Sequence, residues 1–330
     1  MEEKHIRFIQ DESIQNKTIL LRVDFNVSLN PNNLTIADDA RIRQSIPTIE
    51  YLLENNNKLI IVSHLGRPKE PRDPKYSMKI VCNQLHEYLP QHPIRLINDF
   101  LTEDKSTFIN QKQNEIFVLE NTRYYPGEKE NDQEFAKKLA SFAEVYVNDA
   151  FGVSHRAAAS VVGVTQYLPS YGGKLLKKEI EMISQVMNNA KHPVVSIIGG
   201  AKIDSKIHII DKLIDISDSV VIGGGLANTF LYAQGYDIGK SFVQTEKKEV
   251  ALQLIEKAKK DNVELVLPAD CIVGNPQELE KGGKVYKIKD IPSEEQILDI
   301  GPETSARIGA VIAKAKTIIW NGPVGYFENP

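Results

Sequence analysis

The chain has 330 residues, which is enough for two domains that each bury a core of their own. With 42% hydrophobic and 25% charged residues, its composition is typical of a soluble globular protein and excludes disordered, collagen-like and disulfide-scaffold classes. The net charge of −4 gives no electrostatic reason to expect nucleic acid or an anionic membrane as a partner. Any site for an anion must therefore be local.

The cysteines and the uncharged segments narrow the class further. Cys82 and Cys271 lie far apart and form no CxxC motif, so we predict buried structural thiols. The first residues contain no apolar signal region. The longest uncharged run, 219–236, holds four glycines and is too polar to span a bilayer. These features predict a cytoplasmic protein without a membrane partner.

Arginine and glycine are unevenly distributed along the chain. Nine of the ten arginines lie within residues 1–190, whereas 14 of the 20 glycines lie within 191–330. Arginine binds carboxylates and phosphates through two parallel hydrogen bonds, and glycine lets the backbone approach a phosphate closely. The two halves are therefore expected to bind different anionic ligands.

Short apolar runs alternate with amphipathic stretches in the first half. The runs are predicted as buried strands, at 19–23, 59–62, 116–119 and 145–147. The amphipathic stretches between them have helical spacing, at 38–57, 78–89 and 135–142. Pro47 interrupts the first of these stretches, so a kink or a shorter helix is expected there. This alternation predicts a parallel α/β sheet.

A long amphipathic stretch, 174–189, has no return strand of its own and is the candidate connector between domains. After it the alternation resumes, with strands expected at 194–198, 220–222, 263–267 and 317–320 and helices at 205–216, 245–260 and 304–316. We therefore predict an α/β protein with two Rossmann-like lobes built on parallel sheets. The expected domains are 1–173 and 191–330, joined by an interdomain helix at 174–190.

Ligands of open parallel sheets bind beyond the carboxyl ends of the strands. In the first half those positions carry Arg67, Arg123 and Arg156, which with Arg41 and His64 are expected to converge as a basic cup for a small polyanion. The alternative for each arginine is an ion pair at the surface.

Several neighbouring polar residues also have structural interpretations. Asp24 and Asn26 could cap or turn the chain, and His64 could be a structural histidine. Arg22 lies within a strand, where an interaction with a core carboxylate is expected rather than contact with a ligand.

In the second half the strand ends are rich in glycine, at 199–202, 223–225 and 321–325. A strand that leads through glycines into a helix offers free N–H groups to a phosphate, so a nucleotide is the natural candidate. Tight turns are the structural alternative. Asn228 stands where a dinucleotide fingerprint needs its last glycine, and 235–241 is one residue short of a Walker A loop. Lys202 and Lys206, four residues apart, would share a face of a helix.

Taken in order, seven segments resemble those of phosphoglycerate kinase, and the resemblance covers essentially the whole chain. They are Arg-Val-Asp-Phe-Asn (22–26), Ser-His-Leu-Gly-Arg-Pro (63–68), Glu-Asn-Thr-Arg-Tyr (120–124), Asn-Asp-Ala-Phe-Gly (148–152), Gly-Gly-Ala-Lys (199–202), Gly-Gly-Gly (223–225) and Trp-Asn-Gly-Pro (320–323). One such match would be weak, but seven in order at matching spacing are highly specific.

The resemblance implies a glycolytic kinase that transfers the acyl phosphate of 1,3-bisphosphoglycerate to MgADP, giving 3-phosphoglycerate and MgATP. It implies that one set of residues binds the glycerate: Asp24, Asn26, Arg41, His64, Arg67, Arg123 and Arg156. It implies a second set at the nucleotide: Lys202, Lys206, Gly223, Gly224, Asn321 and Glu328. Arg41 and Lys202 would be catalytic, Mg²⁺ would arrive with the nucleotide, and the protein would be a monomer that closes about a hinge.

Two departures from the family pattern lead to further expectations. Ala158 stands where family members usually have a second histidine after the Phe-Gly turn. The sequence ends at Pro330, before the family's Gly-Gly-Asp-Thr/Ser segment with its Mg²⁺ ligand. The chain is therefore expected to be a poor catalyst whose second sheet exposes an edge or a face. The alternatives are a non-catalytic nucleotide- or glycerate-binding fragment and, more distantly, a dehydrogenase with a Rossmann lobe.

Overall fold

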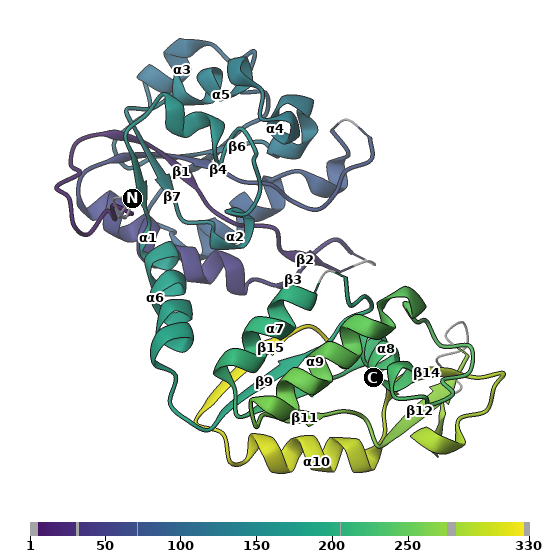
Figure 1. Cartoon of the computed structure of the whole chain (residues 1–330). Coiled ribbons are helices and arrows are strands. Elements are labelled where there is room, and N and C mark those ends of the chain that lie inside the picture. The colour runs from purple at the N-terminus through teal and green to yellow at the C-terminus, as the bar shows by residue number, and fades with distance from the viewer. Residues whose placement is uncertain (1–5, 31–32, 71, 205, 276–281, 327–330) are drawn as a thin grey trace. The chain divides into compact units, whose positions relative to one another are not determined.

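The structure is a computed structural model that describes residues 6–30, 33–70, 72–204, 206–275 and 282–326. The chain divides into two compact units, Met1–Met182 and Ile183–Pro330, and the division falls inside a long helix, α6 (Lys174–Asn189). Both units are α/β, and each carries a parallel sheet (Figure 1). Within the described ranges, no helix combines the length and the apolar character needed to cross a bilayer.

The sheet of the first unit has the strand order β5-β6-β4-β1-β7-β8, and all of its neighbours run parallel. Its strands are β1 (Thr18–Arg22), β4 (Lys58–Val62), β5 (Ile94–Ile97), β6 (Ile116–Leu119), β7 (Val145–Asn148) and β8 (Ser170–Gly172). The strands β1, β4, β6 and β7 confirm the four predicted strands to within one residue at each end. In the sequence these strands are unbroken runs of apolar residues, because helices cover both faces of the sheet.

The helices of the first unit are divided between the two faces of its sheet. Helices α1 (Ala40–Glu54) and α2 (Lys79–Tyr88) pack on the face that carries Leu21 and Ile61. Helices α3 (Lys105–Ile109) and α5 (Gln133–Ala140) pack on the opposite face, which carries Leu20 and Ile60. The remaining elements are α4 (Pro126–Glu130), the short strand pair β2 (Ser28–Leu29) and β3 (Ile36–Asp38), and the 3₁₀ turns η1 (Pro74–Tyr76), η2 (Thr122–Tyr124), η3 (Phe151–Val153) and η4 (Gly163–Gln166).

Helix α1 runs through Pro47 for 15 residues, so of the two outcomes expected at this proline, a kink or a shorter helix, the proline does not end the helix. A proline inside a helix removes one backbone hydrogen bond and crowds the preceding turn. Here Ile42, Ile49 and Leu52 are fully buried on the same helix. Their burial stabilises the helix by more than the proline costs it, since each fully buried aliphatic side chain contributes about 1.5–3 kcal/mol.

Helix α6 occupies the predicted connector range, and its first turn is attached to the first unit. Asp149, which is fully buried, accepts a hydrogen bond at Oδ1 from the N–H of Leu176 (3.0 Å). The N–H of Asp149 donates to the carbonyl of Arg22 (2.8 Å), at the end of β1. Gly173 must lack a side chain here, because a Cβ would lie 2.2 Å from Oδ1 of Asp149. Beyond Leu176 no described side chain of α6 is buried.

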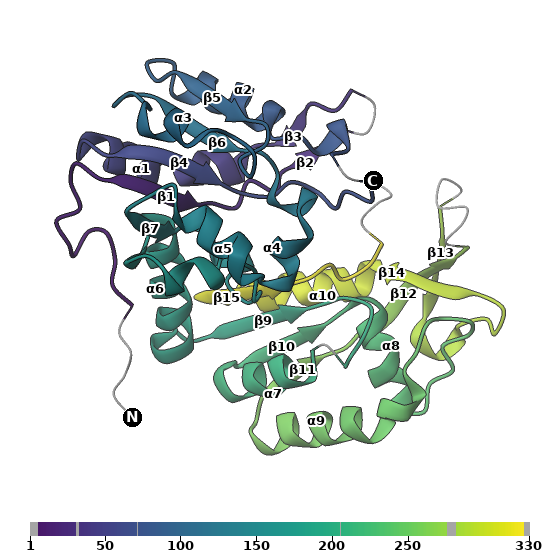
Figure 2. The same ribbon diagram turned by 90° about the horizontal axis from the view of Figure 1, so that it is seen from above.

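The parallel sheet of the second unit has the order β11-β10-β9-β15. Its strands, which agree with the predicted ranges to within one residue, are β9 (Val194–Ile198), β10 (Ser219–Ile222), β11 (Glu264–Val266) and β15 (Thr317–Asn321). Helices α7 (Ile207–Ile216), α8 (Gly224–Ala233) and α9 (Lys248–Lys260) cover one face, and α10 (Pro302–Ile312) covers the other (Figure 2). A 3₁₀ turn, η5 (Thr245–Lys247), precedes α9.

Strand β15 lies at the edge of this sheet and, among the described residues, pairs only with β9. Two of its large side chains are exposed, Ile318 by 48% and Trp320 by 62%. An edge strand with apolar side chains is a site where another chain can pair and aggregation can start.

A small antiparallel sheet in the second unit was not predicted from the sequence. Its order is β13-β12-β14, with β12 (Asp270–Gly274), β13 (Lys284–Lys287), the turn η7 (Ile288–Asp290) and β14 (Gln296–Ile300). Its apolar face packs against Leu231 of α8 and Ile238. The strands contain partly exposed residues and interrupt the strand–helix alternation, so the pattern that predicts a parallel sheet gives no sign of them.

Asp270 connects this sheet to α10. Its buried carboxylate accepts hydrogen bonds from the N–H groups of Glu303 (3.0 Å) and Thr304 (2.8 Å) and from the Thr304 hydroxyl (2.6 Å). Burial acts to raise the pKa of Asp270, but these hydrogen bonds outweigh it and hold the pKa below its usual value. The carboxylate satisfies the first-turn N–H groups of α10, so α10 begins two residues before the predicted start.

We predict that Asp270→Asn lowers the free energy of unfolding by about 1–3 kcal/mol, since an amide N–H₂ group then faces the N–H donors of α10. The folded-state pKa is depressed, so the stabilisation is present above the unfolded-state pKa of about 3.9 and is lost as pH falls through the folded-state value. Urea unfolding at several pH values measures this effect. The difference in the free energy of unfolding between wild type and variant should narrow on acidification. Asp261→Asn, at the exposed end of α9, is the control; a gap that widened on acidification would contradict the role of Asp270.

Candidate active site

Four loops of the first unit follow parallel strands and therefore meet at one edge of the sheet. They follow β1, β4, β6 and β7 and carry residues 22–26, 63–68, 120–123 and 149–156. The structure brings together at this edge the residues that were predicted from the strand ends.

Polar side chains of these loops bind the backbone of neighbouring loops. The hydroxyl of Ser63 donates to the carbonyl of Val23 (2.8 Å) and accepts from the N–H of Phe25 (2.9 Å), which joins the ends of β4 and β1. Oδ1 of Asn26 accepts from the N–H of Gly66 (2.8 Å). These bonds fix the loop backbone before any ligand is present.

Asn121 is the most extensively bonded of these side chains and is fully buried. Its Oδ1 accepts from the N–H groups of Leu65 (3.2 Å) and Arg123 (3.1 Å), and its Nδ2 donates to the carbonyls of Leu65 (2.7 Å) and Tyr76 (2.8 Å). The side chain thereby sets the position of the backbone that carries Arg67 and Arg123. Asn121 belongs to one of the seven family-like segments, but no role was predicted for it from the sequence.

We predict that Asn121→Asp lowers the free energy of unfolding by about 2 kcal/mol or more, because a carboxylate then faces the carbonyls of Leu65 and Tyr76 without a proton to donate. Urea unfolding followed by circular dichroism measures the change. Asn98→Asp, at an exposed position of the same unit, adds the same charge and should shift the midpoint little. Equal shifts in the two variants would show that added charge, rather than the lost bonds, causes the effect.

A pocket of about 810 Å³ opens at this edge of the sheet. Three carboxylates line it, Glu70, Glu128 and Glu130, together with seven basic side chains: Arg22, His64, Arg67, Lys69, Arg123, Lys129 and Arg156. Arg67 and Arg156 are exposed, Arg123 is partly buried, and Arg22 and His64 are buried. Ala158, at the position where the family pattern has histidine, also lines the pocket and contributes no polar group.

Burial and the crowding of positive charge shift the pKa values of two lining residues, Arg123 and His64. Burial lowers the pKa of Arg123, and the nearby Arg156, Arg67 and Arg22 lower it further. Burial, followed by the charges of Arg22, Arg123, Arg156 and Arg41, lowers the pKa of His64 to about 2. His64 is therefore neutral at physiological pH, and a bound anion would relieve the repulsion among the arginines.

The other predicted residues of the first unit do not line this pocket. Arg41 forms an ion pair with Asp24, and Asn26 holds Gly66. Arg22 forms no direct ion pair with a carboxylate among the described residues. Its Nε donates to the hydroxyl of Ser160, which in turn donates to the buried Glu128. The expected core carboxylate is therefore present, but it interacts with Arg22 through this hydroxyl.

The glycine-rich loops of the second unit pack directly on one another. A Cβ on Gly199 would lie 1.9 Å from the carbonyl oxygen of Pro323, and one on Gly223 would lie 2.6 Å from Cβ of Val324. Gly224 has a φ of 66° and lies against the backbone of Gly200. The N–H of Leu226 donates to the carbonyl of Gly200 (2.8 Å). The close approach of these three loops therefore requires the glycines, whether or not they also contact a ligand.

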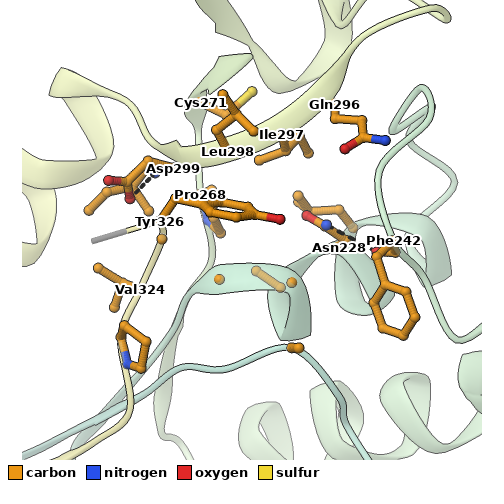
Figure 3. A pocket seen from close by; sticks show the side chains of 18 of the residues that line it. Asn228, Phe242, Pro268, Cys271, Gln296, Ile297, Leu298, Asp299, Val324 and Tyr326 are labelled. Carbon is orange, nitrogen blue, oxygen red and sulfur yellow. Dashed lines mark hydrogen bonds between the residues drawn. The ribbon is translucent and has the colours of Figure 1, made fainter. Parts of the chain in front are cut away.

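A second pocket, of about 460 Å³, lies beside these loops and the small antiparallel sheet. Gly200, Gly224 and Gly225 form part of its wall, and Cys271, Leu298 and Tyr326 form another part. Figure 3 shows the ring of Tyr326 projecting into the pocket, with Asn228 and Phe242 on one side and Asp299 on the other. The pocket joins exposed loop backbone to an apolar, partly aromatic cavity.

The predicted nucleotide residues lie in different places relative to this pocket. Gly224 lines it, and Gly223 caps α8. Lys206 caps α7 and donates to Oδ1 of Asn321, while Lys202 lies in the loop before α7. The lysines therefore do not share a helix face, which corrects that expectation. Glu328 lies outside the described residues.

The apolar lining of this pocket was not predicted from the sequence. Phe242 lies in a loop, and Leu298 and Asp299 belong to β14 of the unpredicted sheet. Burial raises the pKa of Asp299, which accepts a hydrogen bond from the N–H of Ile300 (2.7 Å). An apolar side chain in a strand is equally consistent with a place in the core, so only the fold identifies it as part of a pocket.

The described residues include no group of three or more His, Cys, Asp or Glu side chains that could hold a metal ion. Magnesium prefers several oxygen ligands in octahedral geometry, and carboxylates are its usual protein ligands. A magnesium ion held mainly by the phosphate oxygens of a nucleotide needs only one or two protein carboxylates and no such group.

A family model described as phosphoglycerate kinase matches residues 9–330. The chain belongs to the phosphoglycerate kinase family. The phosphoglycerate kinase of Borrelia garinii subsp. bavariensis is 44% identical over 325 residues, a match that covers 98% of this chain and 82% of that protein. The phosphoglycerate kinase of Dictyoglomus turgidum is 44% identical over 331 residues, which covers 100% of this chain and 83% of the relative.

Solved structures of the phosphoglycerate kinase family share the fold of this chain. Phosphoglycerate kinase from Coxiella burnetii has a TM-score of 0.79 at 39% sequence identity, and the match covers 98% of this chain and 82% of that one. The enzyme from Pyrococcus horikoshii OT3 also has a TM-score of 0.79, at 29% identity and the same coverage. The α/β fold with two Rossmann-like lobes and the resemblance drawn from seven motifs are confirmed, and the chain is related to enzymes.

Proposed function

We propose that this protein transfers the acyl phosphate of 1,3-bisphosphoglycerate to MgADP, forming 3-phosphoglycerate and MgATP, and catalyses the reverse reaction. The observation that carries the proposal is the difference between the two pockets in a chain of this family. One pocket is lined by arginines, and the other joins glycine-rich backbone to an apolar cavity. A small polyanion suits the first, and a nucleotide suits the second.

The pocket of the first unit suits a glycerate that carries a carboxylate and a phosphate. Arg67, Arg123 and Arg156 offer paired N–H donors, and their mutual repulsion favours an anion between them. Asp24 and Asn26 belong to the same set of loops, and Arg41, in the first turn of α1, pairs with Asp24. We infer that Arg41 leaves or shares its ion pair with Asp24 when the substrate is bound.

The pocket of the second unit suits the base and the phosphates of a nucleotide. Its apolar lining, with the ring of Tyr326, provides a surface on which a purine can stack. The N-terminus of α8 offers a phosphate the positive end of the helix dipole, while the N–H groups of Gly223 and Gly224 donate to the carbonyls of Ile198 (3.0 Å) and Val324 (2.6 Å). Lys202, Lys206 and Asn321 would act at the phosphates.

Phosphoryl transfer requires little covalent chemistry from the protein, so catalysis depends on positioning and on positive charge near the transferred group. We assign that charge to Arg41 and Lys202. Magnesium, when bound with the nucleotide, would neutralise part of the phosphate charge. Because the two substrates occupy different units, we infer that a hinge movement precedes transfer. A role as a non-catalytic binding fragment is not favoured by the family match.

We predict that each substrate protects its own unit from amide hydrogen exchange. ADP should slow exchange at residues 199–204 and 223–230, and 3-phosphoglycerate should slow it at 63–68, 120–123 and 149–156, because bound ligand orders the loops it contacts. Mass spectrometry of the full chain measures both. Protection by ADP confined to the first unit would contradict the assignment of the nucleotide.

We predict that Arg41→Ala lowers kcat by about 10²–10³-fold while weakening the binding of 3-phosphoglycerate much less, since one charge that acts in the transition state is worth about 2.7–4 kcal/mol. A coupled assay with ATP and 3-phosphoglycerate gives kcat and KM. Arg43→Ala is the matched control, because Arg43 lies on the same helix and pairs with Asp39. An unchanged kcat in Arg41→Ala would remove Arg41 from the mechanism, and no turnover by the wild-type chain would remove the proposed activity.

A further inference from the structure

Arg22 is the most deeply buried arginine of the pocket, with 2% of its surface exposed. Its guanidinium has a partner on each nitrogen. Nε donates to the hydroxyl of Ser160 (2.9 Å), Nη1 donates to the carbonyl of Val23, and Nη2 lies 3.2 Å from Nδ1 of His64. A guanidinium with three fixed partners has one orientation.

Ser160 also has a fixed orientation, because Glu128 contacts it twice. The Ser160 hydroxyl donates to Oε1 of Glu128 (2.6 Å), and the Ser160 N–H donates to Oε2 (2.9 Å). Since the hydroxyl proton points to Glu128, the oxygen lone pairs are available to accept from Arg22. The negative charge of Glu128 thereby stabilises the buried guanidinium through one intervening hydroxyl.

The contact between Arg22 and His64 determines the position of the histidine proton. A guanidinium has five N–H donors and no acceptor, so Nδ1 of His64 must accept the hydrogen bond. A neutral imidazole that accepts at Nδ1 carries its single proton on Nε2. Burial and the surrounding arginines, which lower the pKa of His64 to about 2, exclude the doubly protonated ring near neutral pH.

We propose that Arg22 is a positioning residue that locks His64 as the neutral Nε2–H tautomer, so that the ring presents one uncharged, directional N–H donor to an anion in the pocket. No described residue accepts a hydrogen bond from Nε2, and His64 lines the pocket. The arginines supply charge from several directions, whereas this donor selects the position of one oxygen.

The identity of the oxygen rests on the proposed function, under which it belongs to the glycerate substrate or to its phosphate. The tautomer itself does not depend on any substrate. Arg22 therefore contributes to recognition through His64 rather than by contact with the ligand.

The first experiment reads the tautomer directly on the full chain. Multiple-bond ¹H–¹⁵N correlation spectra of ¹⁵N-histidine-labelled protein distinguish a protonated from an unprotonated ring nitrogen, and loss of one of the seven sets of signals in His64→Gln assigns His64. We expect Nε2 protonated, Nδ1 unprotonated, and no titration across the neutral range. A proton on Nδ1, or a doubly protonated ring, would overturn the proposal.

The second experiment tests the function of the donor with inorganic sulfate, which does not titrate in the neutral range. His64→Gln places an amide donor near the position of Nε2, whereas His64→Asn places one near Nδ1. We expect sulfate affinity by calorimetry to stay within about threefold of wild type in the Gln variant and to fall about tenfold or more in the Asn variant. Equal losses in the two variants would overturn the role of Nε2.

The third experiment tests Arg22 itself. Arg22→Lys keeps a cationic donor, and Arg22→Met keeps similar volume without one, so the Lys variant should retain the tautomer and the Met variant should show mixed tautomers with weaker sulfate binding. An unchanged tautomer in a folded Met variant would overturn the positioning role. If the Met variant does not fold, the wild-type spectrum still tests the tautomer of His64, and the variants His64→Gln and His64→Asn still test the role of Nε2. None of these readouts requires phosphoryl transfer, so a failure of this positioning proposal can be distinguished from a failure of the proposed function.

Discussion

The repulsion among like charges at the strand ends of the first unit is the constraint on which much of its polar structure depends. Arg22, Arg67, Arg123 and Arg156 line one pocket, and a protein without bound anion must hold them together against their mutual repulsion. The buried carboxylate of Glu128 reduces that repulsion, and the neutral His64 does not add to it. An uncharged histidine in this position adds a donor without adding a further positive charge.

The second unit prepares its pocket by a different physical means. There the backbone itself approaches closely, and the absence of side chains at Gly199 and Gly223 lets three loops touch. Rigid packing of this kind holds the start of α8 and the apolar cavity in fixed positions without bringing like charges together. The uneven distribution of arginine and glycine along the sequence thus corresponds to two ways of building a site in advance of its ligand.

Sequence patterns predicted the parts of the fold that follow a regular period. Eight of the ten strands that the structure describes in the two parallel sheets, all but β5 and β8, and helix α6 were found from apolar runs and helical spacing, because burial on both faces leaves a strong signal. The sheet formed by β12, β13 and β14 was missed, since its partly exposed strands leave no unbroken apolar run in the sequence. The sequence left open whether Pro47 kinks helix α1 or shortens it, and α1 continues through the proline because tertiary packing outweighs the local preference.

The candidate site was predictable to the extent that its residues follow strands. His64 and the arginines at 67, 123 and 156 were found in this way and line one pocket. The side chains that hold the loops, above all Asn121, were not found, because an asparagine that binds four backbone groups looks the same in sequence as one that faces solvent. The apolar residues around Tyr326 were missed for a similar reason, since only topology separates a pocket wall from a core.

The attachment of α6 to Asp149 has a mechanical consequence. Asp149 bonds through its side chain to the N–H of Leu176 and through its own N–H to the carbonyl of Arg22, so the first turn of α6 moves with the strand that carries Arg22. The later turns of α6 bury no described side chain and lack that attachment. A force that moves the later turns of α6 would therefore bend the helix after Leu176. Its first turn would stay fixed next to the arginine-lined pocket.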